Sequence, residues 1–338
     1  MSLMKKKIFM TGFFVCLSSI LWAQETDSVR YPTFKVDGTM KNKFEIASET
    51  GKGRFSVRNS RLGVSGMFTS YASYRAQIEL SNNGNFEVLD LYGSFLPIEG
   101  LSLSLGQTSI PLFNSYITSP GSMMFANRAF IGKYFISTRD IGFLADYDFN
   151  IGSIPTSIEL GLYNGNTIND PVWRDRLSYG ARLELGGMKG LRSTIKFYDY
   201  FNMPEIHEFF YGADLRYEAD NWKVETEVMK RDNKDFPEDQ TLSYYLQGAY
   251  VFPLNDSWIF KHVIPAARWD AIDKNRDESG FDVNRLTLGL GLGLTKKYFS
   301  SIFRLDYELY MIKNNLDILN LYEEMDSNKF TIELMLTF

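Results

Sequence analysis

The sequence predicts an all-β protein: a transmembrane antiparallel β-barrel of 16 strands, with short periplasmic turns and a long third loop folded into the lumen. Three observations lead to this class: an amphipathic final segment, alternating polarity along the chain, and connections that alternate between short and long. Residues 330–338 alternate apolar and polar side chains and end in Phe338. A period of two indicates a strand with one apolar face. We expect this strand to close the barrel and Phe338 to be recognised by the barrel-assembly machinery.

The first 23 residues have the pattern of a secretory signal peptide. Three lysines at residues 5–7 form a basic start, and residues 8–22 form an apolar stretch that is too short to span a bilayer as a helix. Cleavage is expected after Ala23. It would remove Cys16, the only cysteine, so the exported chain is expected to have no disulfide and no thiol chemistry.

The rest of the chain is expected to form one domain. Residues 24–33 would be a short periplasmic segment and residues 34–338 the barrel. No later stretch of about 18 apolar residues predicts a membrane-spanning helix, which leaves a soluble exported protein or a β-barrel. The chain carries 36 basic and 41 acidic residues, and the predicted cleavage removes three of the basic ones. This negative charge argues against nucleic acid as a partner.

Strands are predicted wherever about ten residues alternate in polarity between turn residues. The predicted strands are 34–48, 54–68, 71–80, 88–96, 101–107, 139–149, 156–163, 177–186, 191–201, 207–219, 222–231, 241–252, 258–271, 281–294, 299–313 and 329–338. An even number of strands is what a bacterial barrel of one chain requires.

The connections between these segments alternate in length. The short ones are 69–70, 97–100, 150–155, 187–190, 220–221, 253–257 and 295–298. The longer ones are 108–138, 164–176, 232–240, 272–280 and 314–328, and 49–53 and 202–206 are short exceptions at the same end. Short periplasmic turns opposite longer outer loops are typical of outer-membrane barrels.

The two faces of the strands differ in a way that predicts which one meets lipid. From residue 285 to 294 every even position holds Leu, whereas the odd positions hold Arg, Thr or Gly. Residues 303–310 repeat this pattern, with acids and an arginine on one face. A barrel of this size is too wide to fill with wall side chains, so its lumen is wet. The charged face is therefore expected to line the lumen. A large soluble sandwich with a leucine core is the alternative.

The longest connection, residues 108–138, is the third loop, and its many apolar residues favour a position inside the lumen. No Asp or Glu occurs between residues 100 and 139, whereas Arg128, Lys133 and Arg139 are present. We expect these three side chains to form the pore constriction, where basic groups favour anions. The alternative is that the loop packs against the wall and its basic groups pair with Asp140 or Asp146.

Charged residues of both signs are predicted on the lumen face. The basic candidates for the pore lining are Arg61, Arg75, Arg182, Arg216, Arg268, Arg285 and Arg304. The acidic residues predicted to face them include Glu79, Asp90, Glu159, Asp214, Asp270, Asp306, Glu308 and Glu333. Mixed charges on a wall are expected to pair with one another before they act on a solute.

Several short motifs occur in a particular order in the first half of the chain. They are Arg58-Asn-Ser-Arg61-Leu62-Gly63-Val64-Ser-Gly66, Tyr74-Arg75-Ala-Gln77, Leu89-Asp90-Leu-Tyr92, Gly106-Gln107 with Pro111, Asn127-Arg128, Arg139-Asp140-Ile141-Gly142 and Leu162-Tyr163-Asn164-Gly165. In this order and spacing they resemble the phosphate-selective porin O/P family of outer-membrane channels. The resemblance covers residues 54–165, and beyond these only the strand pattern is similar.

The resemblance implies a homotrimeric porin of 16 strands with a constriction made by the third loop. The matching motifs contain Arg61, Arg75, Arg128 and Arg139, which makes these the strongest candidates for the pore lining. Phosphate-selective members use a cluster of lysines and a ladder of arginines. The third loop here contains only two basic residues, Arg128 and Lys133, so the resemblance does not predict phosphate as the solute.

The expected function is passive diffusion of small hydrophilic or anionic solutes across the outer membrane of a Gram-negative bacterium, with no cofactor and no metal. One alternative is a non-conducting surface barrel, whose acidic loops would bind a partner or the divalent cations that bridge to lipopolysaccharide. Outer-membrane lipid is a partner in either case. A barrel hydrolase is a weaker alternative, since His207 and His262 are predicted at opposite ends of the barrel.

Overall fold

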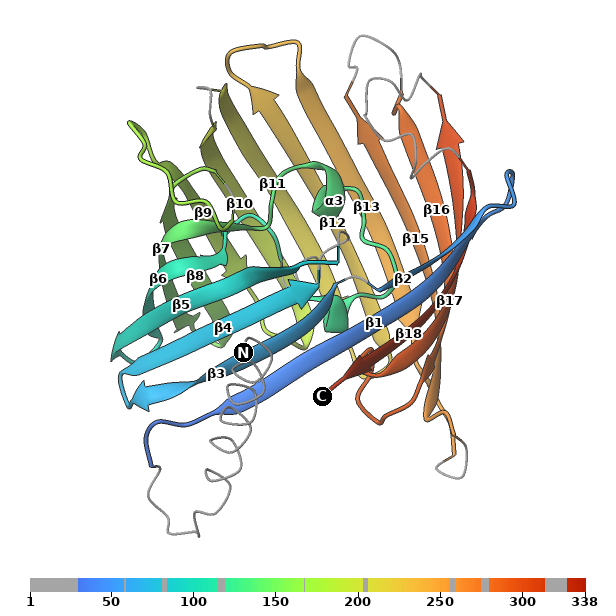
Figure 1. The fold of residues 1–338 in the computed structure, drawn as a ribbon, viewed down its shortest axis with the longest axis horizontal. Helices are drawn as coiled ribbons and strands as arrows, with labels where there is room; N and C mark the ends of the chain where they lie inside the picture. The colour runs from blue at the N-terminus through green and yellow to red at the C-terminus, as the bar shows by residue number, and fades with distance from the viewer. Residues whose placement is uncertain are drawn as a thin grey trace, which may run out of the picture.

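The computed structural model describes residues 30–57, 59–80, 84–114, 119–166, 168–202, 206–255, 259–274, 280–313 and 327–338. The predicted signal peptide and most of the predicted periplasmic segment lie outside these residues. Among the described residues no helix has the length and apolar character needed to cross a membrane. Nearly all regular structure is β-strand (Figure 1).

The strands form one antiparallel sheet that closes on itself. They are β1 (Lys35–Ala47), β2 (Gly53–Val57), β3 (Ser60–Thr69), β4 (Ala72–Leu80), β5 (Phe86–Ile98), β6 (Leu101–Ser109), β7 (Arg139–Ile151), β8 (Ile154–Tyr163), β9 (Ser178–Leu185), β10 (Gly190–Asn202), β11 (Ile206–Glu218), β12 (Trp222–Asn233), β13 (Gln240–Tyr250), β14 (Phe252–Pro253), β15 (His262–Asp273), β16 (Val283–Gly293), β17 (Ile302–Ile312) and β18 (Lys329–Thr337). Because β2 continues into β3 and β13 into β14, the wall is a closed barrel of 16 strands, as the sequence predicts.

The barrel closes at β1, which pairs with β18 on one side and with both β2 and β3 on the other (Figure 1). Asn42 of β1 is opposite Val57, and Thr39 is opposite Arg61. Between these two pairs, the segment that joins β2 to β3 has one residue more than the facing segment of β1. This extra residue makes a β-bulge. Asn59 in the bulge adopts a φ of 57°. The backbone amide of Lys41 donates to the hydroxyl of Ser60 at 2.9 Å, which replaces a bond of the interrupted ladder.

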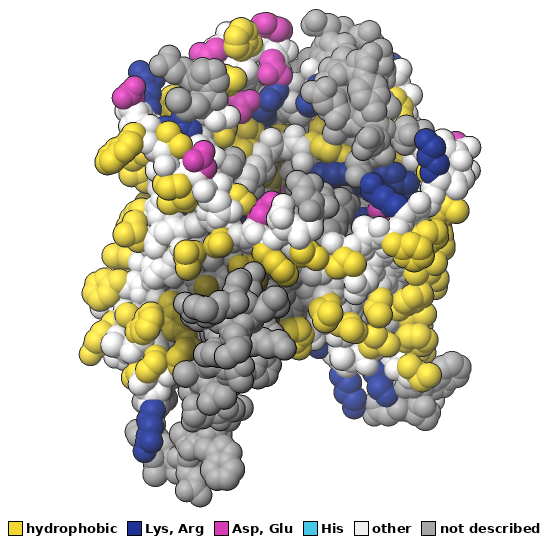
Figure 2. Space-filling model, viewed as in Figure 1, with side chains coloured by type: hydrophobic (Ala, Val, Ile, Leu, Met, Phe, Trp, Pro, Cys, Tyr) yellow, Lys and Arg dark blue, Asp and Glu magenta, His cyan; other side chains and the backbone are white. Residues whose placement is uncertain are grey.

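The wall has an apolar exterior and a polar interior. In β16 the side chains of Leu288 and Leu290 are 52% and 39% exposed, whereas those of Arg285 and Thr287 are buried. This is the reverse of a soluble barrel. Figure 2 shows hydrophobic side chains spread over the outer wall, with acidic side chains gathered at the end that carries the longer loops.

The two predicted sets of connections lie at opposite ends of the barrel, but 254–261 and 294–301 are longer than the predicted turns 253–257 and 295–298. One end carries 70–71, 99–100, 152–153, 186–189, 219–221, 254–261 and 294–301, and the other carries 48–52, 81–85, 110–138, 164–177, 203–205, 234–239, 274–282 and 313–328. Trp258, the predicted start of a strand, lies outside the described residues; residues 259–261 are not strand, and β15 begins at His262. The amide of Leu254 donates to the carbonyl of Lys261 at 2.8 Å and closes a wider turn. The apolar residues in this part of the sequence match the pattern of a strand, which explains the early start that was predicted.

The described parts of the third loop, residues 110–114 and 119–138, lie inside the barrel, which confirms the prediction. The loop contains the short helices η1 (Pro120–Ser122) and α3 (Ile131–Tyr134), and Figure 1 shows α3 between the walls. The loop's apolar side chains are buried against the inner faces of β8 to β18. Leu112 and Ile131, for example, are fully buried in a cluster with Tyr198 and Phe210. Burial in this cluster explains why a loop of this composition is stable inside a polar lumen.

Candidate pore and constriction

Basic side chains of the wall hold the third loop by its backbone carbonyl groups. These donors are Arg268 to Asn127 (3.0 Å), Arg285 to Arg128 (2.8 Å), Arg304 to Met123 (2.5 Å), Lys41 to Ala126 (2.6 Å), Lys223 to Ser122 (3.0 Å) and Arg182 to Phe113 (3.1 Å). A buried carbonyl without a partner costs roughly 1–3 kcal/mol. This set of bonds therefore makes the loop a fixed part of the wall.

Two acids of the same wall accept from the loop's amide groups. Asp306 accepts from the amide of Ala126 at 2.7 Å, and Asp270 accepts from the amide of Phe130 at 3.1 Å. The wall thus supplies both the donors and the acceptors that the loop backbone needs. An acidic side chain on the loop would compete with these carboxylates for the same basic partners, which is consistent with the absence of acids from the loop sequence.

The structure separates the predicted lining arginines into two groups. Arg268, Arg285 and Arg304 face the lumen but are only 1–3% exposed, because the third loop covers them. Their charges are met by acids on neighbouring strands, for instance Asp270 at 2.5 Å from Arg285 and Glu333 at 2.7 Å from Arg304. These three arginines hold the loop and do not border an open passage.

Arg182 and Arg216 are also held by neighbours. Arg182 lies 2.5 Å from Glu159, in addition to its bond to the loop. Arg216 is buried and donates to the carbonyl of Met188 at 2.8 Å, near the end with the short turns. Period-two patterning correctly predicts that both side chains face inward, but it does not reveal what covers them.

Arg61, Arg75 and Arg139 lie in β3, β4 and β7, on a part of the wall outside the apolar clusters of the third loop (the open wall), and Arg75 has the most exposed side chain of the three, at 20%. Each is paired with a carboxylate. The pairs are Arg61 with Glu79 (2.5 Å), Arg75 with Asp37 (2.9 Å) and Arg139 with Asp90 (2.6 Å). Arg75 also lies 3.9 Å from Asp90, which joins the last two pairs in one chain of alternating charges. This wall is therefore close to neutral.

The bulge between β2 and β3 adds a polar group to this wall. The side-chain amide of Asn59 donates to Glu79 at 2.7 Å, beside the bond from Arg61. Glu79 is also within electrostatic range of Arg128 on the third loop.

The three predicted constriction residues lie on different elements and differ in exposure. Arg128 is half-buried in the third loop, and Lys133 in α3 is exposed, with its ammonium 4.9 Å from the ring centroid of Tyr134. Arg139 is the first residue of β7 and pairs with Asp90. Of the acids expected as alternative partners of the loop's basic groups, Asp140 accepts from the backbone amides of Ile141 and Gly165, and Asp146 accepts from the hydroxyl of Ser157.

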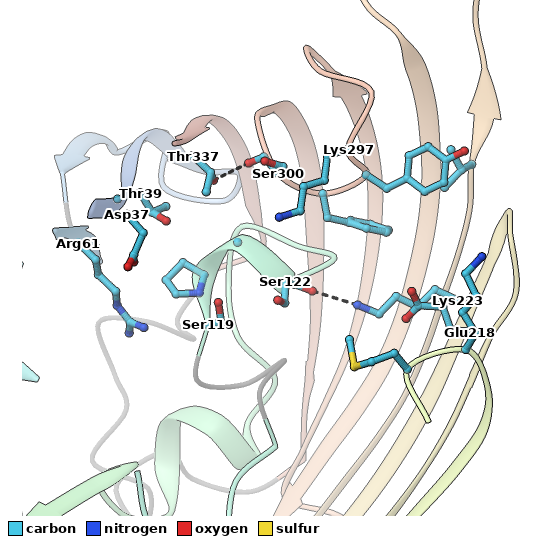
Figure 3. A pocket seen from close by; sticks show the side chains of 18 of the residues that line it. Asp37, Thr39, Arg61, Ser119, Ser122, Glu218, Lys223, Lys297, Ser300 and Thr337 are labelled. Atoms are coloured by element: carbon cyan, nitrogen blue, oxygen red, sulfur yellow. Dashed lines mark hydrogen bonds between the residues drawn. The ribbon is translucent and has the colours of Figure 1, made fainter. Parts of the chain in front are cut away.

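A cavity of about 660 Å³ lies at the end with the short turns, between the open wall and the third loop (Figure 3). Arg61 and Asp37 project into it from one side, and Lys223 and Glu218 from the other. The η1 turn of the third loop, with Ser119 and Ser122, lies between the two sides. The cavity is thus lined by charges of both signs and by small polar groups, as a passage for hydrated solutes requires.

Lys41 was not among the predicted lining residues. The structure shows it buried, bonded to Ala126 and 3.1 Å from Glu333. The sequence contains a signal for this inward position, because Lys41, Lys43 and Glu45 alternate along β1 with outward-facing residues.

The two histidines lie at opposite ends of the barrel, as predicted. Nε2 of His207 is 2.5 Å from Asp199, on the exterior side of β10 and β11. His262 starts β15 and packs edge-on against Tyr298. Within the described residues no three His, Cys, Asp or Glu side chains form a group that could hold a metal ion.

No family model matches this sequence, and no curated protein matches it. Solved structures do match the fold. The complex of Salmonella typhi OmpF with daunomycin aligns with a TM-score of 0.68 at 11% identity, over 91% of this chain and 98% of that one. The outer-membrane channel DcaP of Acinetobacter baumannii aligns with a TM-score of 0.59 at 10% identity, over 94% and 100%.

A third similar structure is the trimer form of OmpT, an outer-membrane protein of Vibrio cholerae, with a TM-score of 0.57 at 10% identity, over 91% of this chain and 100% of that one. At these identities the likeness concerns the fold alone. The chain thus has the architecture of outer-membrane porins over nearly its whole length, with the third loop inside the barrel.

Proposed function

We propose that this chain forms a pore in the outer membrane through which small hydrophilic solutes diffuse passively. The observation that carries the proposal is the third loop, which is fixed to one side of a polar lumen and leaves a charged wall and a cavity of about 660 Å³ on the other side. A structural plug would be expected to cover both sides. No energy source is part of the proposal, because a fixed loop in a wide barrel needs none.

The proposed selectivity is weak and favours anions. On the open wall three arginines are paired with three carboxylates, so their fields largely cancel. Arg128 and Lys133 on the third loop add two positive charges to a segment that has no acid. Basic groups at a narrow point favour anions. The neutral wall gives no support to a specific phosphate site.

The proposed location follows from the exterior of the barrel, where the apolar side chains require lipid. Export would use the signal peptide predicted at residues 1–23, and the end with the short turns would face the periplasm. A homotrimer is part of the proposal. It is supported by the resemblance of residues 54–165 and by the trimer form in which the Vibrio cholerae protein of similar fold was solved.

The experiment that tests the function is conductance in a planar bilayer. We expect stepwise openings from purified protein in KCl, and a reversal potential under a KCl gradient that has the sign of chloride preference. A potassium preference would retain the pore and contradict the proposed role of Arg128 and Lys133. Absence of conductance from correctly folded protein would reject the pore and favour a surface barrel with a binding role.

A further inference from the structure

An apolar groove of about 640 Å³ lies on the exterior of the barrel, across β8 to β12. It is lined by Ile158, Ala181, Leu183, Ile195, Ala213 and Val228. The groove arises from side-chain size. Ala181 is opposite the much larger Phe197 and Ala213 is opposite Ile195, so each small residue leaves a depression beside a large one. A groove of this kind accommodates a hydrocarbon chain better than it accommodates a flat protein surface.

The groove ends in a cation on the side of the longer loops. Lys230 of β12 lines it, with its ammonium 5.6 Å from the ring centroid of Tyr211 and 2.6 Å from Asp232. Tyr211 is opposite Lys230 in the ladder and opposite Phe197 on its other side. Along the strands the exterior therefore changes from aliphatic to aromatic and charged.

The next layer toward the longer loops contains hydrogen-bonding groups on the exterior. Asp199 is opposite Tyr179 on one side and Phe209 on the other. Only 7% of Asp199 is exposed, and its carboxylate lies 2.5 Å from Nε2 of His207. A charged group on the lipid face of a barrel is costly, and the cost falls near the membrane interface. This layer is thus best placed at the head groups of a membrane.

Two exposed cations form the outermost layer. The ammonium of Lys234 lies 5.1 Å from the ring centroid of Phe209, and the guanidinium of Arg176 lies 5.7 Å from that of Phe201. Neither side chain makes an ion pair with another residue in the described part of the chain. Stacking on an aromatic ring orients a cation but leaves its charge unneutralised. These two charges are therefore available to an anion.

From the order of these layers we infer that β8 to β12 bind one phosphorylated, acylated lipid of the outer leaflet. An acyl chain fills the groove, the layer of Asp199 and His207 lies at the depth of the head group, and Lys230, Lys234 and Arg176 contact its phosphate. This inference rests on the proposed membrane location, with the longer loops outside. A second copy of the chain is less suited to this face, because it would have to neutralise the exposed cations as well as fill the groove.

The test measures binding of a bisphosphorylated, acylated glucosamine disaccharide to purified full-length protein in detergent, by native mass spectrometry. The variant Arg176→Ala with Lys234→Ala is expected to weaken binding on the order of thirtyfold, since each cation near a charged membrane surface is worth about a factor of five. The matched control is Lys52→Ala with Lys313→Ala, which removes two exposed cations at the β1–β2 turn and the end of β17, outside β8 to β12, and should leave binding unchanged.

A second variant tests the groove. Ala213→Phe fills the depression beside Ile195 without changing charge, and we expect it to weaken binding of the same lipid at least tenfold, the loss of roughly two buried methylene groups. A dephosphorylated form of the lipid should bind as weakly to the wild type as the intact lipid binds to the Arg176 and Lys234 variant. All variants should keep the wild-type conductance, because they alter only the exterior.

Several outcomes would overturn the inference. Equal binding of the dephosphorylated lipid would mean that no phosphate is recognised, and full competition by inorganic phosphate would mean an anion site without a groove. Dimers that disappear with Ala213→Phe would identify a second copy as the occupant. Failure of the pore proposal can be distinguished from failure of this inference. Wild-type protein that binds the lipid but does not conduct would reject the pore and support the lipid site.

Discussion

The phenyl ring of Phe338 occupies the space that a side chain on Gly38 would fill. The two backbones are joined by hydrogen bonds in both directions, from the amide of Gly38 to Phe338 at 3.0 Å and from the amide of Phe338 to Gly38 at 3.1 Å. A Cβ atom on Gly38 would overlap the ring. The last aromatic residue of the chain therefore closes the barrel against a glycine of β1.

Replacing this glycine is expected to weaken closure. Gly38→Ala forces the ring of Phe338 to turn away from β1, and because this ring is 65% exposed the cost is expected to be that of an unfavourable rotamer, about 0.5–1.5 kcal/mol. The measurement is the fraction of folded barrel in urea, from the heat-dependent mobility shift on a gel. Gly93→Ala in β5 is the control, because the nearest atom to its new Cβ is 3.8 Å away. Equal stability of the two variants would contradict the closure argument.

Loss of a loop anchor should loosen the third loop. Arg304→Met removes the donors to Met123 and leaves a buried carbonyl unpaired, at about 1–3 kcal/mol. We expect faster proteolysis within residues 110–138 and larger, noisier conductance. Arg231→Met is the control, since Arg231 makes its ion pairs with Glu208 and Asp239, which both lie outside the third loop. Unchanged proteolysis would show that the apolar contacts alone hold the loop.

Reversing the charge of the third loop should reverse the selectivity. With Arg128→Glu and Lys133→Glu the loop changes from two positive to two negative charges, opposite a wall that is close to neutral. The reversal potential under a KCl gradient is expected to change from the sign of chloride preference to that of potassium preference. Lys52→Glu in the β1–β2 turn serves as the control. Unchanged potentials in the double variant would mean that the loop does not set the field.

Freeing an arginine of the open wall should strengthen anion preference. Asp37→Asn removes one of the carboxylates that pair with Arg75, whose side chain is 20% exposed in the cavity. The permeability ratio of chloride to potassium is expected to rise. Asp220→Asn is the comparison, because Asp220 is 89% exposed at the rim of the same cavity, where water screens its charge. A similar rise in both variants would assign the effect to the rim.

The strands were predictable because any barrel with an apolar exterior and a wet interior needs side chains that alternate between apolar and polar along each strand. In β16 this pattern yields both the strand and the orientation of Arg285. The bulge at Asn59 and the wide turn after Pro253 were not predictable. Both depend on which backbone groups across the sheet are left to pair, which local polarity does not record.

The sequence by itself determined the strand count, the inward faces and the apolar third loop, since each follows from residue type and spacing along one chain. Only the tertiary structure decided which inward arginines remain open to the lumen. Arg75 and Arg285 have the same pattern in their strands, yet one lines a cavity and the other lies under the loop and binds its backbone. The difference depends on where a loop distant in sequence comes to rest, and that is set by the apolar clusters that form only when the barrel closes.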